Sequence, residues 1–179
     1  TLSAISDYHI RRGNIKESLK YDTRICSDEG VPLKSKLDRV NIYTYDQKVY
    51  VENYFRIGGI ITQLTIDYPT DRRVVEKYAS HLIAGGELEA ALEYMLRHLD
   101  DESSTAEDNL SALQLIYYLK RHDIITEELE RAEERYPDNV EILSFLGFVF
   151  GEMGSYDRAI ETFEDALTVV DSDKERSTL

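Results

Sequence analysis

The sequence repeats itself at a fixed interval. Tyr68-Pro69 recurs as Tyr136-Pro137, and Gly86 recurs as Gly154. The two intervals are equal, and each is twice a period near 34, which is typical of repeat proteins in which each repeat is one supersecondary unit. The interval therefore predicts an array of stacked units instead of one globular core.

The segments that follow the two glycines align without gaps over residues 86–95 and 154–163, and Leu99 then falls opposite Leu167. An alanine follows each glycine by five residues and a large apolar residue by nine, which places both on one face of a helix. A small residue at this position allows two helices to approach closely. The pattern predicts a helix after each glycine, packed against a neighbouring helix.

A third copy lies between these two. Counting back half of the interval from Gly154 leads to Lys120, between one apolar helical pattern that includes Leu113 and Ile116 and another that includes Leu129 and Ala132. The chain therefore has a middle repeat whose turn glycine is replaced by lysine.

These residues resemble the tetratricopeptide repeat (TPR) family, bacterial type, whose 34-residue unit is a helix–turn–helix. The last copy fits the family pattern best, followed by the copy around Gly86 and then by the middle copy. In the last copy the matching residues are Leu146, Gly147, Phe150, Gly154, Ala159, Phe163 and Ala166. A further, degenerate copy is indicated by Ile5, Ile10, Gly13, Ser18 and Ile25, with Asp22 in place of the expected large apolar residue.

The resemblance implies an all-α fold, a right-handed superhelical stack (α-solenoid) of about five antiparallel helix pairs. Apolar periodicity predicts helices over 2–12, 15–27, 33–44, 49–67, 71–84, 87–99, 106–119, 123–135, 138–152 and 156–170. The predicted divisions are two degenerate repeats over 1–70, repeats over 71–104, 105–138 and 139–172, and the start of a further helix or a tail over 173–179. Additional residues are expected near 28–32 or near 45–48, because Gly13 and Gly86 lie further apart than two repeat lengths.

Charge and composition exclude some classes of partner for this chain. The net charge of −14 repels a phosphate backbone, so nucleic acid is not an expected partner. No stretch approaches the roughly 20 apolar residues of a membrane span, so this segment is not expected to insert directly into a membrane. Cys26, the single cysteine, is expected to be a small core residue.

No motif in the chain indicates catalysis. The four histidines fall in different repeats without metal-ligand spacing, and Gly85-Gly86 lacks the lysine and hydroxyl residue of a phosphate loop. We expect no catalytic residues, no metal site and no cofactor, and interpret the chain as a non-enzyme.

In the TPR family the first helix of each pair lines a concave groove that binds peptides or partner proteins. The resemblance therefore implies a scaffold for protein–protein interaction. Projecting the helical period onto the three first helices gives the groove residues Arg73, Glu76, Ser80, Ile83, Leu110, Gln114, Tyr117, Tyr118, Ser144, Phe148 and Glu152.

Some TPR proteins bind chaperone carboxylates through cationic groove residues. Here the matching positions hold Glu76, Ser80, Leu110, Gln114 and Ser144 together with Phe148, so the sequence argues against that role and favours an apolar or mildly basic ligand. Two alternatives remain. The chain is a regulatory or presenting module of a larger enzyme or cell-envelope assembly, or it self-associates, for example as a homodimer. Similar bacterial arrays are often exported, which favours the periplasm or cell envelope over the cytoplasm.

Overall fold

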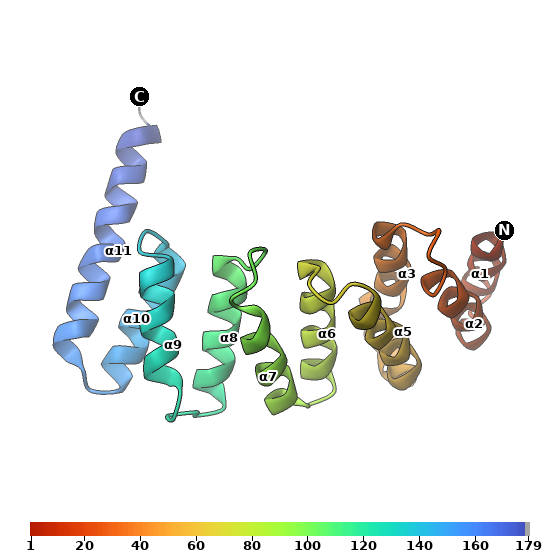
Figure 1. Cartoon of the computed structure of the whole chain (residues 1–179), viewed down its shortest axis with the longest axis horizontal. Coiled ribbons are helices and arrows are strands. Elements are labelled where there is room, and N and C mark those ends of the chain that lie inside the picture. Colours follow the sequence, from red (N-terminus) through yellow and green to blue (C-terminus); the bar gives the residue numbers. More distant parts are fainter. Residues whose placement is uncertain (178–179) are drawn as a thin grey trace. The chain divides into compact units, whose positions relative to one another are not determined.

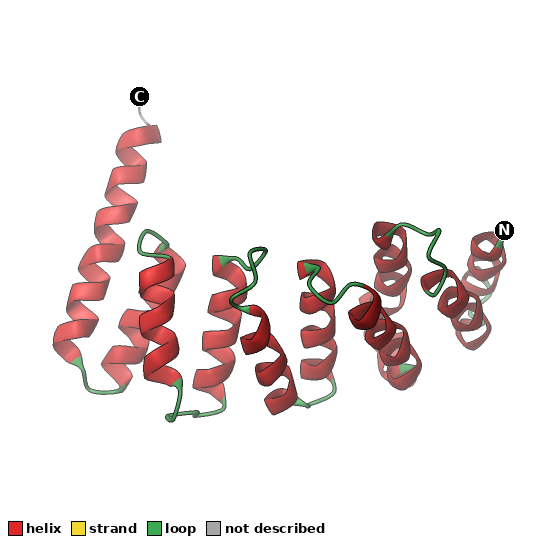
Figure 2. Cartoon of the chain, in the orientation of Figure 1, coloured by secondary structure: helices red, strands yellow, loops and turns green. Residues whose placement is uncertain are grey.

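The computed structural model describes the backbone of residues 1–177 and the side chains of residues 1–170. Within that part the chain is helical and contains no strand, which confirms the predicted all-α class (Figure 2). It divides into two compact units, unit 1 over residues 1–87 and unit 2 from residue 88 onwards. The predicted repeat over 71–104 contains the boundary between the two units.

Unit 1 contains α1 (Leu2–Arg11), α2 (Ile15–Cys26), α3 (Leu33–Tyr45), α4 (Gln47–Glu52), α5 (Tyr54–Asp67) and α6 (Arg72–Ala84) (Figure 1). The single helix predicted over 49–67 is wrong. Asn53 leaves the helical conformation at φ −122° and ψ 16°, and its side-chain Nδ2 atom donates to the Val49 carbonyl at 2.9 Å. This residue separates α4 from α5. A loop from Ser27 to Pro32 and the short α4 lie where additional residues were expected.

Unit 2 contains α7 (Leu88–His98), α8 (Ala106–Tyr118), α9 (Ile125–Arg135), α10 (Val140–Glu152) and α11 (Tyr156–Ser177). α8 packs against α7, α9 and α10, and α10 packs along α11. Gly147 allows that last contact, since a Cβ atom there would lie 2.8 Å from the Phe163 ring. Residues 173–177, where the start of a further helix or a tail was predicted, continue α11, and residues 178–179 lie outside the described residues.

Side-chain caps begin several of these helices. The Asp71 carboxylate accepts from the Arg73 amide at 3.0 Å, and the Asn139 side chain accepts from the Ile142 amide at 2.9 Å. Such caps satisfy amide groups that have no partner within the helix.

Four helix–turn–helix connections share one turn geometry. Gly13, Gly86 and Gly154 have φ between 73° and 78°, and Lys120 has φ 54° at the equivalent place. In each case the next amide donates to the carbonyl five residues earlier, as in Asn14 to His9, Glu87 to Leu82, Arg121 to Ile116 and Ser155 to Phe150. This 6→1 hydrogen bond ends the first helix of the pair. The middle repeat therefore keeps the turn although it lacks the glycine.

Lys120 adopts a left-handed conformation that costs a non-glycine residue about 1–2 kcal/mol. Glycine relieves this strain, but it also increases the entropy of the unfolded chain, which lowers the free energy of unfolding by about 0.4–1 kcal/mol. We therefore expect Lys120→Gly to raise the free energy of unfolding of unit 2 by about 0.5–1 kcal/mol. Urea unfolding followed by hydrogen exchange in peptides from residues 88–170 measures this change, and a loss of stability would contradict it.

The core of unit 1 is an apolar cluster formed mainly by α2, α3 and α5, and Cys26 lies in it at 2% exposure, as predicted. The wholly buried members of this cluster come from α5 and include Ile57, Ile61 and Leu64. Burial raises the pKa of the Cys26 thiol to about 11, so the thiol is protonated at neutral pH.

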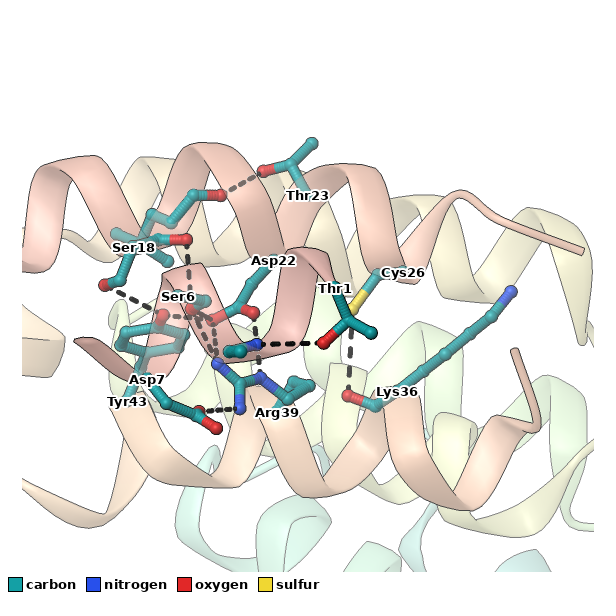
Figure 3. A network of polar contacts seen from close by, with 12 residues as sticks. Thr1, Ser6, Asp7, Ser18, Asp22, Thr23, Cys26, Lys36, Arg39 and Tyr43 are labelled. Carbon is teal, nitrogen blue, oxygen red and sulfur yellow. Dashed lines mark hydrogen bonds and ion pairs between the residues drawn. The ribbon is translucent and has the colours of Figure 1, made fainter. Parts of the chain in front are cut away.

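Beside this core lies a buried polar network that joins α1, α2 and α3 (Figure 3). The carboxylate of Asp22 has no exposed surface, and it accepts from Arg39 Nε at 2.8 Å, from Ser6 Oγ at 2.8 Å and from the Tyr43 hydroxyl. The Arg39 guanidinium also pairs with Asp7 at 2.5 Å. Burial, followed by the hydrogen bond to Asp22, raises the pKa of Tyr43 to about 12. The residue that marked a degenerate repeat is thus the centre of the contacts between three helices.

α5 and α6 meet at a second buried polar side chain, His81. Its Nδ1 atom shares a hydrogen bond with the Tyr50 hydroxyl at 2.6 Å, and the Tyr54 ring stacks on its imidazole at 4.1 Å between centroids. Gly58 lies against the other atoms of the ring, since a Cβ there would be 2.9 Å from His81 Cε1. Burial lowers the pKa of His81, so the imidazole is neutral at pH 7.

Candidate functional site

The side chains predicted to line a groove are mostly exposed. In unit 2, Tyr117 is 37% exposed, Tyr118 71% and Phe148 46%, although a packed core would normally bury such side chains. Gln114 and Ser144 are also exposed, whereas Leu110 is half-buried. α8 and α10, which carry these residues, pack against each other.

Three aromatic rings from these two helices form one cluster. The Tyr117 ring meets the Phe148 ring edge-on at 5.4 Å between centroids and the Phe145 ring at 6.2 Å, and the two phenylalanines are 6.3 Å apart. Edge-to-face packing of this kind fixes ring orientation and is worth about 0.5–1.5 kcal/mol per pair beyond the buried area. We call Tyr117, Phe145 and Phe148 the aromatic cluster. It presents a pre-ordered apolar surface to solvent.

Phe145 is not among the groove residues predicted from the sequence. Its neighbour Ser144 was placed on the groove, and a strict helical projection turns residue 145 by about 100° away from it. A half-buried phenylalanine is large enough to reach Tyr117 from that position. The apolar character of α10, in which Phe145, Phe148 and Phe150 occur within six residues, was the available signal.

A pocket of about 520 Å³ opens beside the aromatic cluster, at the C-terminal ends of α8 and α10. Tyr117 belongs to both the cluster and the pocket wall. The remaining wall residues are Ile116, Tyr118, Lys120, Arg121, His122, Ile125, Val149, Glu152 and Met153. Of these, only Tyr118 and Glu152 are among the groove residues predicted from the sequence.

The charges at this pocket are mixed. Arg121 is held by Asp123 at 2.7 Å and by Glu89 at 3.0 Å, so most of its charge is already compensated. Lys120 and His122 are exposed, and Glu152 supplies an opposing carboxylate. The pocket is therefore an apolar recess with a balanced charged rim, and it has no fork of cations aimed at a carboxylate.

The four groove residues predicted on α6 belong to unit 1. Arg73, Glu76, Ser80 and Ile83 are all exposed. The Arg73 guanidinium pairs with Asp71 at 2.8 Å in its own helix cap. Their place in a binding surface stays a prediction from the sequence.

The described side chains contain no group of three histidine, cysteine, aspartate or glutamate residues placed to hold a metal ion. None of the described helices combines the length and apolar character needed to cross a membrane.

No family model matches the chain, and no curated protein matches it. Several solved structures match the chain in fold. One crystal structure of MamA aligns with 96% of this chain and 97% of its own at a TM-score of 0.60 and 16% identity. A second structure contains MamA of Desulfovibrio magneticus RS-1 from residue 41 to the end. It aligns with 96% of this chain and 94% of its own at the same TM-score and identity.

YrrB, described as a TPR protein with an unusual peptide-binding site, aligns with 92% of this chain and 82% of its own at a TM-score of 0.53 and 13% identity. The chain has a TPR-like fold. This confirms, at the level of fold, the resemblance stated from the glycine and alanine spacing. Because the sequence identities are only 12–16%, the similarity to these structures shows the fold alone.

Proposed function

We propose that the chain is a non-catalytic scaffold and that the aromatic cluster of unit 2 binds a peptide segment or partner protein. The observation that carries the proposal is the exposed, mutually ordered contact of Tyr117, Phe145 and Phe148 next to a pocket. Aromatic side chains on first helices of TPR-like pairs are suited to recognition, because they bury a large area and lose little rotamer entropy. The YrrB description adds a fold neighbour that binds peptides.

The chemistry of the surface favours an apolar ligand. The cluster offers ring faces and edges, and the neighbouring pocket is lined by Ile116, Ile125, Val149 and Met153. An apolar side chain of the ligand inserted there would be shielded from water on several sides. Because Glu152 offsets the exposed cations, an acidic tail gains little at this site, in agreement with the preference for an apolar or mildly basic ligand.

To test this, a library of random peptides is displayed on phage, and peptides that bind the whole 179-residue chain are selected. For a selected peptide, we expect Tyr117→Ala and Phe148→Ala each to weaken binding at least tenfold, because the residues that dominate an interface cost more than about 1 kcal/mol when truncated and about 1.4 kcal/mol is tenfold. Calorimetric titration measures the dissociation constants.

Phe55→Ala is the matched control, because Phe55 is 88% exposed on α5 and lies outside the proposed surface. Circular dichroism checks that each variant keeps its helix content. Peptides that bind the Tyr117 and Phe148 variants as tightly as the unchanged chain would show that this surface is not the binding site.

A further inference from the structure

An apolar stripe on α11 is exposed. Tyr156, Ile160, Phe163 and Leu167 recur at intervals of four, three and four residues, and their exposures are 69%, 58%, 42% and 64%. This spacing places them along one side of the helix. Ala159, Thr162 and Ala166 form the neighbouring buried side, and one side of the Phe163 ring also lies against Gly147 of α10. The uncovered part of the stripe is therefore Tyr156, Ile160 and Leu167.

The corresponding positions of α7 are buried. Ile160 and Leu167 correspond, at the interval that relates Gly154 to Gly86, to Leu92 and Leu99, which are 0% and 6% exposed in and just after α7. In α9 the corresponding residues are the exposed Thr126 and the half-buried Glu133, which are polar. α7 packs against α8, the first helix of the following pair, so the apolar face of α11 resembles the face of α7 that is buried in this unit.

α1 exposes the complementary face. Its Tyr8, five residues before the turn glycine Gly13, is 52% exposed, and Ile5 is 42% exposed. The residues five before the turn in α6, α8 and α10 are His81, Leu115 and Val149, which are 6%, 9% and 1% exposed. First helices within the array thus bury this face, and α1 does not.

The charges beside the two exposed faces are opposite. Arg11 and Arg12 end α1, and the Arg12 guanidinium lies over the Tyr8 ring at 5.3 Å. The edge of the α11 stripe carries the exposed acidic residues Asp157, Glu161 and Glu164. Two α11 helices facing each other would bring like charges together, whereas α1 against α11 pairs opposite charges.

An ion pair within unit 2 shows the expected form of this contact. Glu89 at the start of α7 pairs at 3.0 Å with Arg121, which follows the C-terminal end of α8. Asp157 follows the turn glycine Gly154 as Glu89 follows Gly86, so it stands at the equivalent place on α11. In α1 the place equivalent to Arg121 holds Asn14, and Arg11 and Arg12 lie just before the turn, so either arginine of an incoming α1 helix would lie near Asp157.

We propose that α11 of one copy binds α1 of a second copy head to tail, with Ile160 and Leu167 packed against Ile5 and Tyr8. This contact joins two different surfaces, so each copy keeps one surface of each kind for the next copy. It is separate from the aromatic cluster and does not depend on the proposed peptide binding.

Sedimentation velocity and light scattering of the 179-residue chain test this. The unchanged chain is expected to gain mass with increasing concentration. The variants Ile160→Glu with Leu167→Glu, and Ile5→Glu with Tyr8→Glu, are each expected to stay monomeric. An equimolar mixture of the two variants is expected to form a dimer of one copy of each, because each retains the surface that the other lacks.

Ile66→Glu is the control, since Ile66 is 68% exposed on α5 and should not affect assembly. If a glutamate variant loses helix content, Arg12→Glu and Asp157→Lys replace it: each alone should weaken assembly, and both in one chain should restore it. A monomeric unchanged chain, or a mixture that stays monomeric, overturns the proposal. So does an α1 variant that assembles like the unchanged chain, which is the result expected of α11 pairing with itself.

Discussion

Replacing Asp22 with alanine is expected to lower the free energy of unfolding of unit 1 by about 3–5 kcal/mol. The substitution leaves Arg39, whose side chain is only 13% exposed, with the partly exposed Asp7 as its single carboxylate partner. The Tyr43 hydroxyl also loses an acceptor. Breaking one side of a buried ion pair costs more than the pair contributes, because the remaining charge stays desolvated.

Hydrogen exchange of peptides from residues 1–87 in increasing urea measures this loss. Asp38→Ala is the matched control: Asp38 lies on α3, pairs with Lys34 at 3.3 Å and has a side chain that is 59% exposed. Removing such a surface pair should change stability by about 0.5 kcal/mol or less. Equal effects for Asp22→Ala and Asp38→Ala would show that the network contributes little.

Replacing the whole network with apolar side chains tests whether the unpaired buried charge causes the loss of stability in Asp22→Ala. Asp22→Leu combined with Arg39→Met and Tyr43→Phe removes the buried charges and the hydroxyl together. Apolar replacement of a whole buried ion pair is often neutral or stabilising. We therefore expect the triple variant to recover most of the stability lost in Asp22→Ala.

Alanine substitutions at the adjacent glycines of α5 are expected to have opposite effects. Each glycine should weaken a helix by about 1 kcal/mol relative to alanine. Gly59 is exposed and nothing lies within 4 Å of a Cβ there, so Gly59→Ala should stabilise unit 1 by up to about 1 kcal/mol. Gly58→Ala should instead destabilise it by about 1–3 kcal/mol, as overpacking of a core does.

The difference arises because the His81 ring cannot move away from a methyl group at residue 58. The hydrogen bond from Tyr50 and the stacked Tyr54 ring hold it in place. Urea unfolding of the two single variants measures both effects. In a His81→Ala background the penalty of Gly58→Ala should shrink, and an unchanged penalty would mean that the clash with His81 is not its cause.

Helix positions, and one turn that lacked its glycine, were predictable because they depend on local spacing. Lys120 was placed at a turn by counting back one repeat length from Gly154, and it adopts the left-handed conformation there. Asn53 was not predicted to divide a helix, because its side-chain hydrogen bond to a backbone carbonyl competes with helical geometry in a way that apolar periodicity does not record.

The roles of buried polar residues were harder to predict. Asp22 was interpreted only as a departure from the repeat pattern, since its partners Arg39 and Tyr43 lie 17 and 21 residues further along the chain. His81 was considered as a possible metal ligand, and its burial was not predicted. It lies in the last turn of α6 and is buried, because Gly58 leaves room for its ring.

For the candidate site, periodicity together with the family resemblance placed Tyr117, Tyr118 and Phe148 on a groove, but it did not determine which of these side chains are exposed. It could not predict the pocket, which forms where the turn at Lys120 meets the end of α10. Such a recess depends on how two helix ends are spaced, and no single residue pattern encodes that spacing.

The chain divides into two units, each with its own buried core. The residues on which stability is expected to depend most and the proposed binding surface lie in different units. Asp22 and Gly58 lie in unit 1, whereas the aromatic cluster lies in unit 2. A chain whose first unit is unfolded can therefore keep the aromatic cluster ordered, because repeat proteins lose structure in blocks. Such a partly unfolded chain would expose the apolar core of unit 1 to proteases while the surface proposed to bind a ligand stays folded.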